Sequence, residues 1–264
     1  ELRQETDYIS GYQFKGGASF RLTEEWDIFA NAGYVSKVPI FDQVINDVNG
    51  TKVEDPKNEK FVSFEAGVNS KLFQNQLTLK LNGYYTLWSD RAQSINVLNA
   101  DGTDGLVRLD GINSTFAGIE IEAAYQPIQY VRFDAAFSQG FWTYTDDVSG
   151  EYIPDFSDPN SVEEYNYYIK DLKVGDAPQT QFVLSFTLFF PTGLQTQIAW
   201  RYYDNYYADF DPFSRTDEND KAQVWKVPSY DIFDLHALYR IPGEVAGLDV
   251  SVFGHVFNLF NELY

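Results

Sequence analysis

The chain has 264 residues, 39 acidic against 19 basic side chains, a formal net charge of −20, and 17% aromatic residues that include 19 Tyr and 22 Phe. This charge excludes a nucleic-acid partner, and the absence of Cys excludes disulfides, thiolate catalysis and Cys-ligated metals. No apolar run approaches the ~20 residues of a transmembrane helix; because the chain lacks Met and starts at Glu1, we expect a longer gene product.

Apolar and polar residues alternate with a period of two along most of the chain, which predicts β-strands. The stripe at i, i+3, i+4 and i+7 that marks an amphipathic helix is not found. The predicted strands average ~10 residues, longer than the ~5–6 of soluble sheets and typical of a transmembrane barrel. In chain order they are 12–22, 26–34, 64–70, 77–88, 116–125, 131–138, 179–190, 194–203, 231–241 and 248–256.

Short and long connections alternate between these strands. Short turns are predicted at 23–25, 73–76, 127–130, 190–193 and 241–247, and long polar segments at 37–60, 90–115, 145–178 and 204–228. All long segments therefore lie at one end of the sheet, as in outer-membrane barrels, whose short turns face the periplasm. Aromatic residues border four short turns and predict a membrane-interface girdle: Trp26, Phe73, Tyr130 and Phe190.

The two strand faces differ in chemistry. The alternation places Ile121 and Leu184 on a lipid face, and Ser185 and Gln197 on a lumen face. The lumen face carries many ionisable groups, which favours a wide lumen filled by water or a polar plug. The rival interpretation is a soluble all-β protein whose apolar face packs on a second sheet. The unusually aromatic apolar face favours the barrel.

Several segments resemble TonB-dependent outer-membrane receptors. GHVFNLFNELY (254–264) resembles the signature of their penultimate strand, and PKNEKFVSFEAGV (56–68) resembles a proline–glutamate segment that leads into a strand. Four more segments are similar to the receptors of the Bacteroidota, close to the SusC-like group: GYVSKVPIFDQVI (33–45), NGYYTLWSDR (82–91), GIEIEAAYQP (118–127) and YIKDLKVGDAPQTQ (168–181).

The resemblance implies an all-β, antiparallel transmembrane barrel of about 22 strands. Residues 1–264 would be its C-terminal portion, with about ten strands, while the plug domain, the TonB box and the last strand would lie outside this chain. It also implies nutrient import across the outer membrane, with TonB as partner and, for the SusC-like type, a SusD-like surface lipoprotein. Glycans or peptides are then the expected substrates; a more general receptor would take a ferric siderophore or cobalamin.

Two other functions remain open on the sequence: a passive porin, and a non-transporting barrel such as a secretion-complex subunit or an adhesin. Upstream sequence would separate them, because a plug domain selects the receptor. The acidic runs at 162–168 and 209–221 are interpreted as solvated outer loops, bridged by divalent ions to lipopolysaccharide.

Catalysis is not expected. The chain has two His, no Cys, and neither a G-x-S-x-G nor an H-E-x-x-H motif. Glu120 and Glu122 share a strand face, but on a barrel wall they are expected to bond to a plug or to water. The alternation also brings His236 and His255 together on the lumen face, with Cβ atoms within about 4.5–8 Å. We expect no metal there, because zinc wants three or four protein ligands.

The outer ends of the strands carry the candidate ligand-binding residues. Aromatic rings stack on sugars, peptides or aromatic ligands, and an arginine can hold a carboxylate. An outer aromatic girdle competes for some of these rings; by alternation Tyr202 faces lipid and Tyr203 the lumen. No cofactor is expected. The candidates are Trp88, Arg91, Trp142, Tyr144, Tyr203 and Tyr207.

Overall fold

One large antiparallel sheet dominates the computed structural model, which describes residues 5–45, 52–53, 55–155, 158, 161–243, 245 and 247–264. Its main strands are β1 (Tyr12–Arg21), β2 (Trp26–Lys37), β3 (Glu59–Leu72), β4 (Leu77–Leu98), β5 (Asp104–Ile128), β6 (Val131–Tyr144), β9 (Pro178–Phe189), β10 (Leu194–Tyr207), β12 (Tyr230–Arg240) and β13 (Ser251–Val256). Smaller elements are β7 (Val148–Ile153), β8 (Glu163–Tyr167), β11 (Lys226–Val227) and the 3₁₀ turns η1 (Phe41–Gln43) and η2 (Pro212–Arg215).

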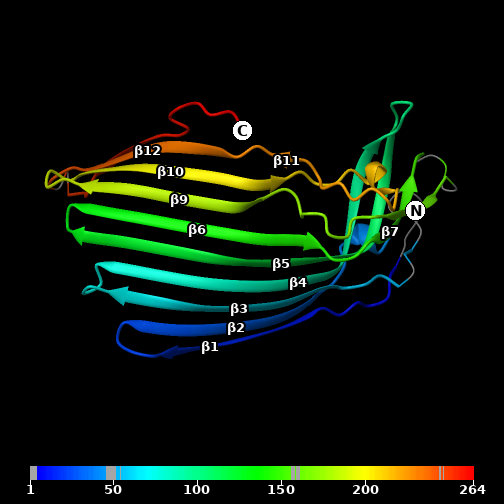
Figure 1. Cartoon of the computed structure of the whole chain (residues 1–264), viewed down its shortest axis with the longest axis horizontal. Helices are drawn as coiled ribbons and strands as arrows, with labels where there is room; N and C mark the ends of the chain where they lie inside the picture. Colours follow the sequence, from blue (N-terminus) through cyan, green and yellow to red (C-terminus); the bar gives the residue numbers. More distant parts are fainter. Residues whose placement is uncertain are drawn as a thin grey trace.

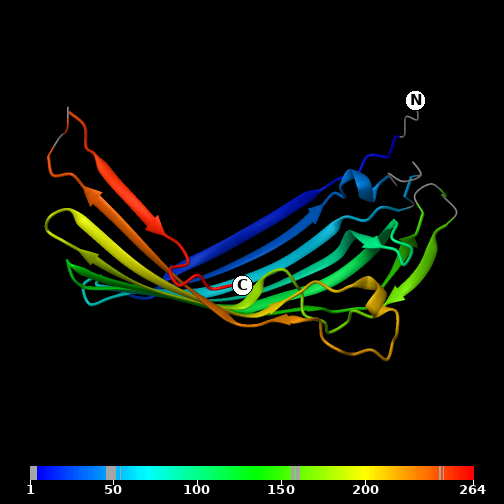
Figure 2. The same ribbon diagram turned by 90° about the horizontal axis from the view of Figure 1, so that it is seen from above.

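The strands follow one another in the order β1-β2-β3-β4-β5-β6-β9-β10-β12-β13. The sheet is curved like a trough and does not close on itself, with β1 and β13 at its two edges (Figures 1 and 2). These ten strands correspond to the ten predicted segments, so the all-β, antiparallel prediction is confirmed. In the part of the chain that the structure describes, no helix is long and apolar enough to cross a membrane.

The two faces of the trough carry different side chains. A hollow of about 370 Å³ opens on one face and is lined by Lys80, Glu122 and Arg132, among others; we call this polar face the inner face. The opposite, outer face presents apolar side chains, with Leu81, Ile121 and Leu184 respectively 50%, 41% and 40% exposed. The four predicted girdle residues, Trp26, Phe73, Tyr130 and Phe190, are also exposed.

The short turns lie at one end of the sheet (Figure 1). Phe73, Gln74 and Asn75 all adopt positive φ between β3 and β4. Gly193, with φ of +87°, ends the β9–β10 turn, where a Cβ atom would lie 2.5 Å from the carbonyl oxygen of Arg240. The turn predicted at 127–130 is shorter than expected, because β5 continues to Ile128.

The segment 90–115 differs from the loop that its polarity predicts. β4 and β5 continue through it as a paired hairpin whose last pair is Leu98 with Asp104. Two register shifts, between Trp88 and Arg91 and between Arg91 and Gln93, separate this hairpin from the strands below. Strand pairing continues beyond these register shifts. The polar composition of the segment does not reveal this pairing. Residues 46–51 and 54 of the segment 37–60 lie outside the described residues.

The long connections pack against each other into what we call the loop cap, residues 95–115, 144–178 and 207–225. β7 pairs with β5 and with β8, although residues 156–157 and 159–160 lie outside the described residues. A cluster of buried apolar residues lies here, at the loop-cap end of the strands. Its members are Val107, Leu109, Ile112, Tyr144, Val148, Tyr167, Ile169, Leu172, Val174, Phe210 and Val224.

Candidate ligand-binding site

Four aromatic rings cross the inner face just below the loop cap: Phe61 of β3, Trp88 of β4, Phe116 of β5 and Trp142 of β6. We call them the aromatic row. Successive ring centroids are 4.8, 6.2 and 5.8 Å apart. Strand register explains the row, because Phe61 lies directly opposite Trp88 and Phe116 directly opposite Trp142. All four side chains are half-buried, so part of each ring faces the trough.

Hydrogen bonds fix the two indoles of the row. Trp88 donates Nε1–H to Glu59 Oε2 at 3.0 Å, and Trp142 donates Nε1–H to the hydroxyl of Tyr84 at 3.0 Å. Glu59 is buried and also accepts from Lys37 Nζ at 3.1 Å, so its charge is compensated. Because both indole N–H groups are used inside the protein, the row offers ring faces rather than donors.

Arg91 lies on the same side as the row. Its guanidinium carbon is 4.8 Å from the Trp88 ring centroid, within the range of a cation–π contact. In a regular strand, residues three apart point to opposite faces. Here Asp90 has a φ of +58°, and the register shifts around it turn Arg91 back onto the face of Trp88. Among the described residues, Arg91 makes no hydrogen bond or ion pair.

The other three candidates lie elsewhere. Tyr144 is only 2% exposed and belongs to the core of the loop cap, where its hydroxyl donates to Asp209 Oδ1 at 3.4 Å. Burial, with the nearby carboxylate of Asp209, raises the pKa of Tyr144 above its ordinary value. Tyr207 packs against the same core. Tyr203 packs against Tyr230 with ring centroids 5.1 Å apart, on strands away from the row.

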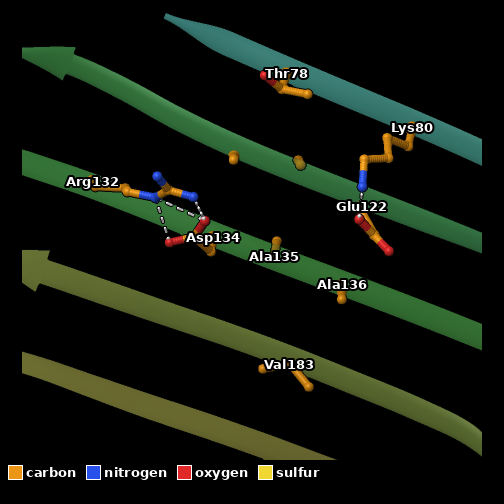
Figure 3. A pocket seen from close by; sticks show the side chains of 10 residues that line it. Thr78, Lys80, Glu122, Arg132, Asp134, Ala135, Ala136 and Val183 are labelled. Carbon is orange, nitrogen blue, oxygen red and sulfur yellow. Dashed lines mark hydrogen bonds and ion pairs between the residues drawn. The ribbon is translucent and has the colours of Figure 1, made fainter. Parts of the chain in front are cut away.

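A charged wall lies on the inner face of β4, β5 and β6 (Figure 3), near the short-turn ends at which β4 and β6 begin. Lys80 donates to Glu122 at 2.8 Å across β4 and β5, and Arg132 makes a forked contact with Asp134, its shortest bond being 2.6 Å. The hollow between them also contacts Val183 of β9. Each pair is internally neutral, so the wall suits water or a polar insertion rather than a catalytic group.

Residues 3–259 match the family model described as TonB dependent receptor-like, beta-barrel. The chain belongs to this family. A comparison with curated proteins gives no match.

Several solved structures are similar to this receptor barrel. The copper transporter OprC has a TM-score of 0.64 at 16% identity, covering 93% of this chain and 33% of its own. The FrpB iron transporter from Neisseria meningitidis has a TM-score of 0.63 at 15% identity, and the match covers 96% of this chain and 35% of FrpB. The pyoverdine outer membrane receptor FpvA from Pseudomonas aeruginosa has a TM-score of 0.55 at 16% identity, and the match covers 93% of this chain and 31% of FpvA. The likeness shows the fold, and the chain spans about a third of these structures.

The receptor barrel also brings its two histidines together. His236 lies directly opposite His255, with their Nδ1 atoms 2.7 Å apart, so the predicted proximity is confirmed. The nearby Asp234 is already bound by Arg201 and by the backbone N–H of Asn258. No group of three residues able to hold a metal ion occurs among the described residues.

Sequence reasoning missed part of the aromatic row of this receptor barrel. Phe61, Phe116, Tyr84 and Glu59 were not among the candidates. Phe116 was recoverable, because it shares a strand face with Glu120 and Glu122, which were assigned to the lumen. Glu59 belongs to the proline–glutamate segment at 56–68, but its bond to Trp88 was not predicted, because it depends on Trp88 lying opposite the start of β3.

Proposed function

We propose that the chain forms part of the wall of an outer-membrane, TonB-dependent receptor that binds a nutrient outside the cell and imports it into the periplasm. The observation that carries the proposal is the family match over residues 3–259. The similar structures are named as transporters or receptors, and we propose no enzymatic activity. The proposal concerns the whole protein, of which this chain would supply the C-terminal portion of the barrel.

The surface chemistry of the sheet supports a membrane position. The outer face would meet lipid, and its backbone groups would be satisfied by strand pairing, as hydrocarbon requires. The exposed aromatics at the short-turn end would lie at the periplasmic interface. The loop cap would then face the outside, next to lipopolysaccharide, with the aromatic row directly beneath it.

The segments GYVSKVPIFDQVI and GIEIEAAYQP support a finer proposal, that the receptor is of the SusC-like type of the Bacteroidota. A SusD-like surface lipoprotein would then cover the loop cap. Contact with TonB would come from an N-terminal part of the longer protein. The charged wall of Lys80, Glu122, Arg132 and Asp134 would face the plug domain.

The ligand would bind on the aromatic row, where Trp88, Arg91 and Trp142 converge. Tyr203, with its neighbour Tyr230, offers a second aromatic contact on the inner face. Tyr144 and Tyr207 would act through the loop cap, because Tyr144 is buried and Tyr207 packs on the same core. They hold the cap that supports the row.

The test is uptake by cells that make the full-length protein. We expect accumulation of its nutrient to need an energised TonB system, and to stop when a protonophore collapses the proton gradient or when TonB is deleted. A strain lacking the receptor is the control. Uptake that continues without TonB would contradict the proposal and identify a passive porin.

A further inference from the structure

We infer that the aromatic row and Arg91 together recognise a ligand in which a ring with an apolar face is joined to a carboxylate. The inference rests on the proposed function and narrows the substrate class. Two classes of ligand combine such a ring with a carboxylate: aromatic carboxylates and acidic sugars.

The row binds through ring faces. Both indole N–H groups are occupied by Glu59 and Tyr84, and Phe61 and Phe116 have no polar atom. A ligand that needs hydrogen bonds from the row therefore finds none. A ligand whose ring has an apolar face, whether an aromatic ring or a sugar, finds a preformed surface, because stacking needs only exposed faces at the right spacing.

Arg91 supplies the charge, because it forms no ion pair among the described residues and the acids of this region bond to other groups. Asp90, its neighbour in sequence, accepts from Lys60 at 2.8 Å. Glu59 is bound by Lys37 and Trp88. Asp209, in the loop cap, accepts from Tyr144 and Gln93. In a chain with 39 acids and 19 bases, a half-buried arginine without an ion partner among the described residues points to an anion from outside.

The position of Arg91 selects the anion. The guanidinium carbon lies over the Trp88 ring, and the N–H edges of the planar guanidinium can hold a carboxylate through two parallel bonds. The carboxylate would lie beside Trp88, and the attached ring would lie over Phe116 and Trp142. No second unpaired cation of the described residues lies on the row, so a single negative charge fits better than a phosphate dianion.

Two matched pairs of probes test the inference on the full-length receptor in detergent, by isothermal titration. The first pair is naphthalene-2-carboxylate and the neutral 2-naphthamide. The second is tri-galacturonate and its fully methyl-esterified form. We expect the charged member of one pair to bind at least about tenfold tighter than its neutral partner, and the pair that responds identifies the source.

Variants assign the effect to the site. Arg91→Gln should remove the preference for the charged probe, while Trp142→Leu should weaken both members of the pair by about tenfold. Arg132→Gln, a cation of the charged wall, and Trp26→Leu, at the short-turn end, are the matched controls and should bind like the parent protein. Heat-modifiability in gels checks that each variant is folded.

Equal affinity for the charged and neutral probes, unchanged binding by Arg91→Gln, or no binding of any probe at millimolar concentration would each overturn the inference. If TonB-dependent uptake persists in that case, only the ligand class is wrong. Loss of TonB dependence itself would overturn the proposed function instead.

Discussion

Two tryptophan N–H groups determine how the aromatic row can be used. A free indole N–H would draw polar ligands towards the ring edge. Glu59 and Tyr84 remove that option and hold the rings in one orientation. The conformational entropy of these side chains is already lost on folding. A ligand therefore binds to rings that lose little further entropy.

Tyr84→Phe tests this role of the hydroxyl. The change leaves the Trp142 N–H without its partner, and we expect a loss of about 1 kcal/mol in barrel stability and greater mobility of the Trp142 ring. Urea unfolding in lipid vesicles and fluorescence anisotropy measure the two effects. Tyr85→Phe is the control, because Tyr85 is 45% exposed on the outer face. Equal effects of the two variants would contradict the assignment.

Tyr167 predicts a pH dependence of the loop cap. Its hydroxyl is buried with no hydrogen-bond partner among the described residues, and burial raises its pKa to about 12. The folded cap thus holds the phenolic proton more tightly than the unfolded cap does. Its contribution to stability is fully present below about pH 10, the unfolded pKa, and is lost as the pH rises towards 12.

Tyr167→Phe should remove that alkaline dependence without lowering stability at pH 7, since no hydrogen bond among the described residues is lost. Limited proteolysis of the cap with an alkali-stable protease, at pH 8 and pH 11, measures it. The same increase in cleavage at pH 11 in both proteins would show that another group is responsible.

Among the elements, β9 and β10 show how the two faces differ. Leu184 is exposed on the outer face, whereas Gln197 on the inner face donates to Thr187 Oγ1 at 2.9 Å. Leu184→Arg should cost about 2–4 kcal/mol of barrel stability, because it places a charge in hydrocarbon. Gln197→Arg should cost much less, since its side chain meets water. Equal costs in heat-modifiability and vesicle-unfolding assays would contradict the membrane position.

The loop cap is the second element with a testable role. Deleting residues 150–165 removes most of β7 and its pairing with β5, and with it the buried Ile153. Phe116 and Trp142 pack against the cap core, so the aromatic row should lose its support. We expect uptake to be abolished and assembly of the barrel strands to be intact. Unchanged uptake would show that this half of the protein is scaffold only.

These elements also show how far sequence patterns reach. Alternation predicted the strands and their faces, and Trp88 and Trp142 were among the candidates at the outer strand ends. It does not settle the face of Arg91, because the left-handed backbone of Asp90 is not visible in a pattern of polarity. It gave no warning that Tyr144 is buried, since that depends on Phe210 arriving from a connection far along the chain.

For the whole molecule, the open edges of the trough have a direct consequence. β1 and β13 each present a row of unpaired backbone groups, which are templates for pairing with another chain. Residues 1–264 produced alone in detergent should therefore associate through these edges, and size-exclusion chromatography with light scattering should show oligomers. The full-length receptor under the same conditions is the control. A monodisperse monomer of the isolated chain would contradict this expectation.

The loop cap also sets an order of events in time. Its core joins Leu109 of β5 to Phe210, which follows β10, and we expect these residues to meet after β5, β6, β9 and β10 have paired. Closing such distant contacts is slow unless the intervening pairs form first. The acidic connections would therefore reach the outside as unstructured chain, and the cap would condense there afterwards. Maturation of the binding surface is then a late step, separate in time from insertion of the wall that carries it.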